Sequence, residues 1–240
     1  MNVTNNTSEV TFHLLHDRAR SIRTHFEPRT EVLNLVSVAG GLASHFMSIS
    51  SEKDCGENSK DELEISMGEL FLALFHTANS CSLDLCRCVK SKLKLNAKKY
   101  PVELCKGKSG KYTKYSDETG ITKTKGQSTV GDQTDLDSSD DFNVTVKEVS
   151  SDINKFVADR LWEPYHTKRN LMLALIGEIG ELAELFQWKG DGNVGAPIGL
   201  TSWDIEEKDK VGQELADVSI YLLRLAVQSN VDIGKAAMNF

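Results

Sequence analysis

The chain has 240 residues, of which 40% are hydrophobic and 26% are charged, and its formal net charge is −7. This length allows one large domain or two small ones, and the acidic balance argues against a nucleic-acid-binding protein, which needs a basic surface to meet phosphates. No apolar run approaches the roughly 20 residues that span a bilayer, and residues 1–10 lack the basic start and apolar stretch of a signal peptide. We therefore expect a protein of the cytosol that does not enter membranes.

The first half, residues 1–106, is expected to form one helical module. The segment 107–149 that follows is rich in Lys, Thr, Ser, Asp and Gly and poor in apolar residues. Such a segment buries too little apolar surface to offset the entropy lost on ordering, so we expect a flexible linker there. Residues 150–240 then form a second helical module.

Helices are predicted throughout this second module. The first covers 152–161, the second 171–188 with Asn170 as its N-cap, and the third follows a cap at Ser202 and extends to about 227. A last helix begins after Asp232. No segment has the pattern of a β-strand, so the sequence predicts an all-α fold.

The two modules resemble each other in sequence. When 29–48 is placed over 169–188, residues identical in both are Arg29, Leu33, Leu35, Gly40, Leu42, Ala43 and Phe46, and when 66–85 is placed over 214–233 they are Leu74, Ala78 and Asp84. A repeat of this length indicates two copies of one helical unit. The prediction is therefore two tandem helical-bundle modules joined by a linker.

Acidic residues distinguish the second copy from the first. Glu178 and Glu181 form one pair three residues apart, and Glu214 and Asp217 form another, so each pair lies on one helix face. Two carboxylates about 4 Å apart repel by roughly 4 kcal/mol at an effective dielectric near 20. Four of them in apolar helices therefore predict a bound cation, and oxygen ligands favour Mg²⁺. In the first copy only Glu69, opposite Asp217, keeps an acid, so that copy is expected to bind no metal.

Three blocks of the second copy resemble the dCTP pyrophosphatases, which are MazG-like all-α nucleoside triphosphate pyrophosphohydrolases. The blocks are Trp162-Glu-Pro-Tyr-His-Thr-Lys-Arg-Asn170, Gly177-Glu-Ile-Gly-Glu-Leu-Ala-Glu-Leu-Phe-Gln-Trp-Lys189 and Gln213-Glu-Leu-Ala-Asp-Val-Ser-Ile-Tyr-Leu222. The resemblance covers residues 152–240 well and 14–113 faintly.

The resemblance implies hydrolysis of a nucleoside triphosphate to its monophosphate and pyrophosphate, with Mg²⁺ as cofactor. Matching positions make Glu178, Glu181, Glu214 and Asp217 the metal ligands and catalytic acids. Trp162, Trp188, Lys189 and Tyr221 match positions that contact the nucleotide. The family also implies a homo-oligomer, here a dimer of two-module chains.

One departure from the family pattern leaves two functions open. The family continues its last helix into an Asn-x-basic-basic-Tyr-Pro segment, which the second copy lacks and the first copy retains as Asn96–Pro101. The first copy could lend this segment to the second, giving a pyrophosphatase for dCTP or modified dCTP that cleans the nucleotide pool. The alternative is a non-catalytic nucleotide-binding or scaffold protein with an incomplete site.

Overall fold

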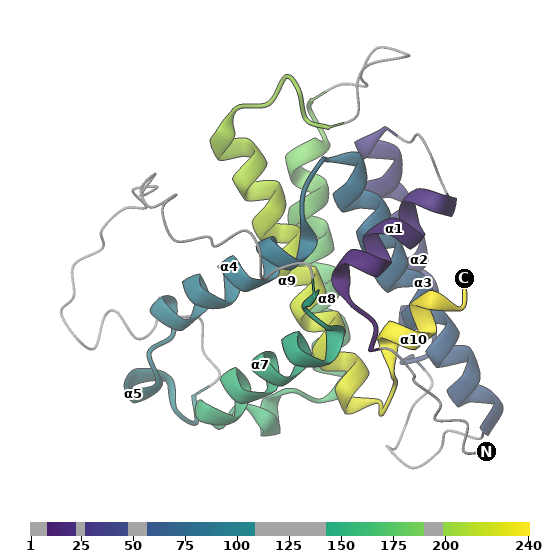
Figure 1. The fold of residues 1–240 in the computed structure, drawn as a ribbon. Coiled ribbons are helices and arrows are strands. Elements are labelled where there is room, and N and C mark those ends of the chain that lie inside the picture. The colour runs from purple at the N-terminus through teal and green to yellow at the C-terminus, as the bar shows by residue number, and fades with distance from the viewer. Residues whose placement is uncertain (1–8, 23–26, 48–56, 109–142, 190–198) are drawn as a thin grey trace, which may run out of the picture.

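A computed structural model describes residues 9–22, 27–47, 57–108, 143–189 and 199–240 (Figure 1). Its helices are α1 (Phe12–Ile22), α2 (Pro28–Ser44), α3 (Glu57–Ser80), α4 (Leu85–Lys99), α5 (Val102–Cys105), α7 (Val146–Asp159), the 3₁₀ turn η2 (Glu163–Tyr165), α8 (Lys168–Phe186), α9 (Ile205–Gln228) and α10 (Ile233–Met238). Within these ranges the only β feature is an isolated bridge between Thr11 and Thr145. The predicted all-α fold is confirmed.

Helix N-termini correct several predicted boundaries. α7 begins at Val146 rather than Asp152, because Thr145 caps it. The Thr145 hydroxyl accepts from the Glu148 backbone N–H, and the Glu148 carboxylate accepts from the Thr145 backbone N–H. The predicted linker, 107–149, therefore extends wrongly into the start of α7. Most of this predicted segment, 109–142, lies outside the described residues.

The caps of the two long helices also differ from prediction. α8 is capped by Thr167, and α9 by Asp204 in a capping box with Glu207. The caps predicted at Asn170 and Ser202 are wrong. The predicted cap at Asp232, whose side chain accepts from the Lys235 N–H, is confirmed.

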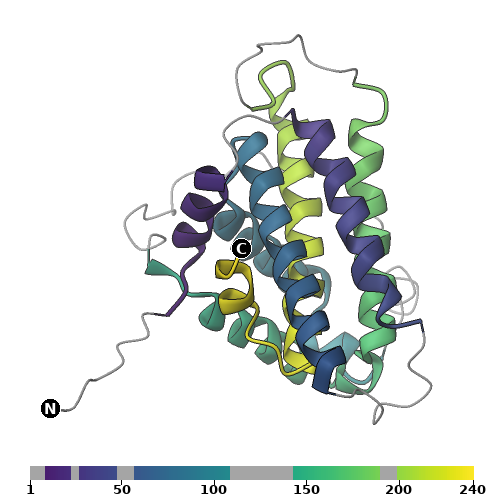
Figure 2. The same cartoon turned by 90° about the vertical axis from the view of Figure 1, so that its right-hand side faces the viewer.

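Four long helices form the centre of the molecule. α2 packs on α3, α8 packs on α9, and α2 also contacts α8 (Figure 2). The core includes Leu35 and Leu42 from α2 and Leu175 and Leu182 from α8, all fully buried. The two halves of the chain thus share one hydrophobic core.

Equivalent segments of the two halves meet in a reciprocal manner. Phe12 N–H donates to the Val144 carbonyl at 3.0 Å, and Val146 N–H donates to the Val10 carbonyl at the same distance. Both bonds belong to the antiparallel bridge between Thr11 and Thr145, which joins the start of α1 to the start of α7. The predicted duplication remains a prediction.

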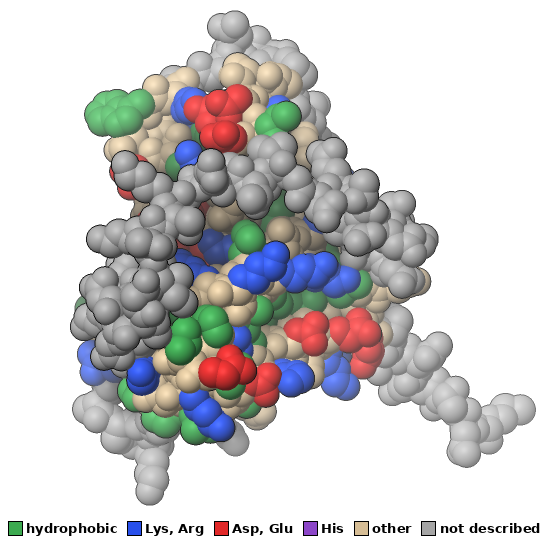
Figure 3. All heavy atoms as spheres, turned by 90° about the vertical axis from the view of Figure 1, so that its left-hand side faces the viewer, with side chains coloured by type: hydrophobic (Ala, Val, Ile, Leu, Met, Phe, Trp, Pro, Cys, Tyr) green, Lys and Arg blue, Asp and Glu red, His purple; other side chains and the backbone are tan. Residues whose placement is uncertain are grey.

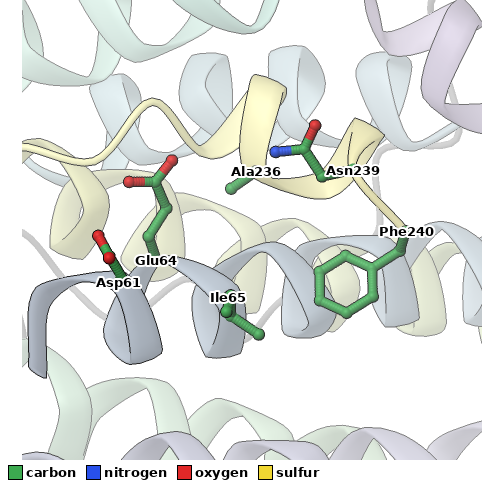
Figure 4. Close-up of a pocket in the computed structure, with 6 residues that line it drawn as sticks. All are labelled: Asp61, Glu64, Ile65, Ala236, Asn239 and Phe240. Carbon is green, nitrogen blue, oxygen red and sulfur yellow. The ribbon is translucent and has the colours of Figure 1, made fainter. Parts of the chain in front are cut away.

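One helix near the end of each half packs on the other half. α4, from the first half, lies on α9, and α10, from the second half, lies on α3. Gly68 makes the second contact possible, because a Cβ there would lie 2.6 Å from the Ala236 carbonyl carbon. Figure 4 shows the cavity beside this contact, lined from α3 by Asp61, Glu64 and Ile65 and from the α10 end by Ala236, Asn239 and Phe240.

None of the described helices is both long and apolar enough to cross a membrane.

Candidate metal and nucleotide site

Three carboxylates from two helices converge at the contact between α8 and α9. Oxygen atoms of Glu178, Glu214 and Asp217 all lie within 4.8 Å of one another. Glu178 stands between the buried Leu175 and Leu182 of α8, while Glu214 and Asp217 are three residues apart on one face of α9. The packing of α8 on α9 therefore brings Glu178 of the first predicted pair beside both members of the second pair.

Burial and mutual repulsion make these carboxylates hard to ionise. Burial, followed by the charges of Asp217, Glu181 and Glu214, raises the pKa of Glu178 to about 7. Burial also raises the pKa of Glu214, and its Oε2 atom is buried without a hydrogen-bond partner among the described residues. Each proton held here is replaceable by a cation.

The cluster has the ligand chemistry of a hard divalent cation. Its groups are all carboxylates, whose oxygen atoms Mg²⁺ prefers, and these atoms lie within 4.8 Å of one another. Glu178, Glu214 and Asp217 would hold it. The fourth predicted ligand, Glu181, is exposed one turn along α8 and outside the triad, although its charge contributes to the raised pKa of Glu178.

α4 brings basic and amide groups from the first half of the chain to these acids. Lys92 forms an ion pair with Asp217 in which both side chains are mostly buried, 12% and 15% exposed. Asn96, one turn further along α4, also hydrogen-bonds Asp217. Burial raises the pKa of Asp217, while these two contacts oppose that rise.

α4 as a whole is strongly basic. It carries Arg87, Lys90, Lys92, Lys94, Lys98 and Lys99. Figure 3 views the side of the molecule that bears α4, and Lys and Arg side chains gather on it. Burial raises the pKa of Glu214, and the charges of Lys92 and Lys99 oppose this rise. An acidic cluster whose oxygen atoms could hold a cation therefore borders a strongly basic helix.

Part of the chain is similar in sequence to curated proteins that share one name. The chain is 42% identical to dCTP pyrophosphatase 1 of Rattus norvegicus over 113 residues, which are 45% of this chain and 64% of the rat protein. It is 51% identical to dCTP pyrophosphatase 1 of Homo sapiens over 85 residues, 35% of this chain and 48% of the human protein. The predicted resemblance to the dCTP pyrophosphatase family is confirmed.

The chain spans between 48% and 64% of the length of these dCTP pyrophosphatases. The mouse protein of the same name is 47% identical over 85 residues. No protein-family model matches the chain.

Two aromatic residues predicted from the dCTP pyrophosphatase resemblance lie near the acids or the α4 segment. Tyr221, one turn after Asp217, is partly buried, and burial followed by the charges of Glu178 and Asp217 raises the pKa of its phenol. Trp162 donates its indole N–H to the Cys105 carbonyl at 3.1 Å and packs edge-on against Tyr100, 5.3 Å between ring centroids. Tyr221 thus lies by the acids, and Trp162 borders the segment that follows α4.

The other two predicted nucleotide contacts lie near the end of α8. Trp188 is 86% exposed. Lys189 forms an ion pair with Glu207 at the start of α9 and lies 4.7 Å from the ring centroid of Trp203. The ion pair places Lys189 beside Glu207, which lies two turns before Glu214 on α9. Their contact with nucleotide remains a prediction.

Sequence reasoning missed Lys92. The Asn96–Pro101 segment was recognisable from the family pattern, but Lys92 lies before it and belongs to no named motif. Its spacing was a usable signal, since residues four apart share one face of a helix. Lys92 lies on the same face of α4 as Asn96, so once Asn96 is placed at the acids, Lys92 is expected there too.

Proposed function

We propose that this chain is a metal-dependent nucleoside triphosphate pyrophosphohydrolase that converts dCTP, or a modified dCTP, to dCMP and pyrophosphate. The observation that carries this proposal is the convergence of Glu178, Glu214 and Asp217 within 4.8 Å, next to the basic helix α4. The relatives named dCTP pyrophosphatase 1 support the choice of substrate and a role in cleaning the nucleotide pool.

The acids and α4 have different roles in binding a triphosphate: the acids hold the metal ion and α4 supplies positive charge. Mg²⁺, when bound, shields the phosphate charge and lowers the pKa of water in its shell. Glu178, Glu214 and Asp217 would hold the ion, and a neighbouring carboxylate other than these three would take the proton of the attacking water. Lys92 and Lys99 meet the negative charge of the pyrophosphate that leaves when the bond to the α-phosphorus breaks.

The position of α4 favours the enzyme over the non-catalytic alternative. That alternative depended on a second half without its Asn-x-basic-basic-Tyr-Pro segment. In this fold Asn96 hydrogen-bonds Asp217 and Tyr100 packs on Trp162, so the segment of the first half lies at the acids of the second. We infer that the first half completes the site within one chain.

Product analysis tests the proposal. The purified chain is incubated with each of the four dNTPs, with Mg²⁺ or with EDTA, and monophosphate and pyrophosphate are quantified. We expect Mg²⁺-dependent release that is greatest with dCTP and is abolished by Glu178→Gln. Glu69→Gln, at the exposed position of the first half that corresponds to Asp217, is the control and should leave turnover unchanged. Nucleotide-induced thermal stabilisation without turnover would establish the binding protein instead.

A further inference from the structure

A buried arginine follows Tyr221 on the face of α9 that carries the acids. Arg224 is three residues after Tyr221 and seven after Asp217, so the three positions share one face of the helix. Seven residues span about 10 Å along a helix axis, which is comparable to the length of a deoxyribose with its base. Arg224 is therefore placed to meet the far end of a nucleotide whose phosphates lie at the acids.

The Arg224 guanidinium has few partners within the chain. Arg224 is 6% exposed, and among the described residues its one hydrogen bond goes from Nη1 to the Asn154 Oδ1 atom on α7, at 2.6 Å. Its Nε atom is buried without a hydrogen-bond partner in the described part of the chain. A buried cation is costly unless hydrogen bonds satisfy its donors, and a guanidinium has five N–H donors. The Nε edge of Arg224 therefore has donors for a group that the chain does not supply.

His166 lies close enough to Arg224 for the two side chains to interact electrostatically. Burial, followed by the positive charge of Arg224, lowers the pKa of His166 to about 4, so its imidazole is neutral at pH 7. A neutral imidazole has one N–H donor and one acceptor nitrogen. The Nδ1 atom of His166 is also buried without a hydrogen-bond partner among the described residues. Donors of Arg224 and an acceptor of His166 therefore lie near each other and unpaired.

Aromatic rings border these two residues. The ring centroid of Trp162 lies 6.4 Å from that of His166 and 5.3 Å from that of Tyr100. Aromatic rings are the groups on which nucleobases stack. Trp162 and His166 are each partly exposed, which gives a base access to them from the surface.

We propose that Arg224 selects the base of the nucleotide, with its guanidinium donating to the N3 and O2 atoms of cytosine and His166 accepting from the 4-amino group. Along this edge cytosine presents one donor followed by two acceptors. Thymine and uracil carry an N–H at position 3, which a guanidinium cannot accept, because it has donors only. Two parallel hydrogen bonds from one guanidinium also fix the orientation of the base.

This inference rests on the proposed function and names the residue that would give it a preference for cytosine. Stacking alone discriminates bases weakly. A site with buried donors discriminates strongly, because a base without matching acceptors leaves those donors unpaired.

Relative turnover of different bases by the full chain tests the proposal. We would measure kcat/KM with Mg²⁺ for dCTP, dTTP and dUTP, in the wild type and in Arg224→Met. The ratio of dCTP to dTTP should fall about tenfold or more in the variant, since a bidentate contact to a base discriminates by about that factor. Arg224→Lys should not restore the ratio, because an ammonium lacks the planar fork. His166→Phe keeps a ring, removes the acceptor and should lower the ratio as well.

Stability and a matched control separate base selection from folding. The melting temperature of Arg224→Met should stay equal or rise, because an apolar side chain replaces a buried cation. Lys155→Met removes an exposed charge from α7, beside Asn154 in sequence, and should keep the wild-type ratio. An active wild type that prefers dCTP, with the same preference in Arg224→Met and His166→Phe, would contradict the assignment of Arg224 alone. A wild type that releases pyrophosphate from no dNTP would overturn the proposed function and this inference together.

Discussion

The Lys92 ammonium supplies a positive charge to the acidic cluster. Its ammonium pairs with Asp217, and both side chains are mostly buried. A buried ion pair stabilises little by itself, but removal of one partner leaves the other charge uncompensated. Because Glu178 and Glu214 lie beside Asp217, the loss of Lys92 leaves three neighbouring acids with less positive charge.

We therefore predict that Lys92→Met destabilises the metal-free protein by about 1–3 kcal/mol and gives it a larger Mg²⁺-induced rise in melting temperature than the wild type shows. Turnover should fall about tenfold or more, since a charge facing the pyrophosphate is lost. Melting curves with EDTA and with Mg²⁺ measure the first effect. Lys94→Met, exposed on the same helix, is the matched control and should change neither quantity.

Glu178 makes the stability of the metal-free protein depend on pH. Its pKa is about 7 in the folded chain, against an ordinary value of 4.5. The folded state therefore holds a proton that the unfolded state loses between these values. The resulting stability is fully present below the ordinary pKa and is lost as pH rises through about 7.

Glu178→Gln has no such proton to lose. In EDTA, its unfolding free energy relative to wild type should rise by about 1–2 kcal/mol from about pH 5 to about pH 8, after allowance for the partial exposure of the carboxyl. Urea unfolding at both pH values measures the difference, with Glu69→Gln as the control. A pH-independent difference would mean that Glu178 ionises as an ordinary carboxyl.

Hydrogen bonds join the residues that follow α7 to the segment that follows α4. Arg160 donates from Nε to the Tyr100 carbonyl at 2.8 Å, and Gly107 N–H donates to the Arg160 carbonyl at 2.8 Å. Tyr165 donates its hydroxyl to the Gly107 carbonyl at the same distance. These bonds hold the end of the first half beside the site of the second.

Arg160→Met should loosen this segment. Arg160 is 4% exposed, so the loss of its hydrogen bonds should cost about 1–3 kcal/mol of unfolding free energy. We expect KM for the nucleotide to rise several-fold while kcat changes less, because the acids stay in place. Steady-state kinetics and melting curves measure both, against Lys155→Met, an exposed position of α7, the helix whose C-cap is Arg160. A fall in kcat at constant KM would contradict a positioning role.

The elements themselves followed from local signals. The apolar spacing of Leu171, Leu175 and Leu182 fixed the buried side of α8, and the Asp232 cap fixed the start of α10. The earlier start of α7 was also readable, since Thr145 and Glu148 stand at capping-box spacing. The crossing of α4 to α9 and of α10 to α3 was not readable, because periodicity shows which side a helix buries and leaves its partner open.

The same limit applies to the site. Glu178, Glu214 and Asp217 could be predicted, since their spacing and the family blocks agree, and they lie together. Lys92 could not be assigned, because its pairing with Asp217 depends on the packing of α4 on α9. Long-range contacts of this kind depend on the tertiary arrangement.

For the whole molecule, the exchange of α4 and α10 makes each half depend on the other. α9 is covered by α8 from its own half and by α4 from the first half, and α3 is covered by α2 and by α10. Buried residues on both α3 and α9 belong to one core, among them Leu70, Leu74, Leu215 and Leu222. Separation of the halves therefore exposes apolar surface on both.

We predict that a chain without residues 1–106 loses both stability and activity. It would expose the α4-facing and α2-facing sides of the second half, at a cost of about 25 cal/mol for each Å² of apolar surface returned to water, and it would lack Lys92 and Asn96 at Asp217. Soluble yield, circular dichroism melting and pyrophosphate release measure the loss. Coexpression of residues 1–108 with residues 109–240 should restore activity, because the two halves meet through packing and hydrogen bonds. A soluble second half with full turnover on its own would show instead that the first half contributes nothing to the site.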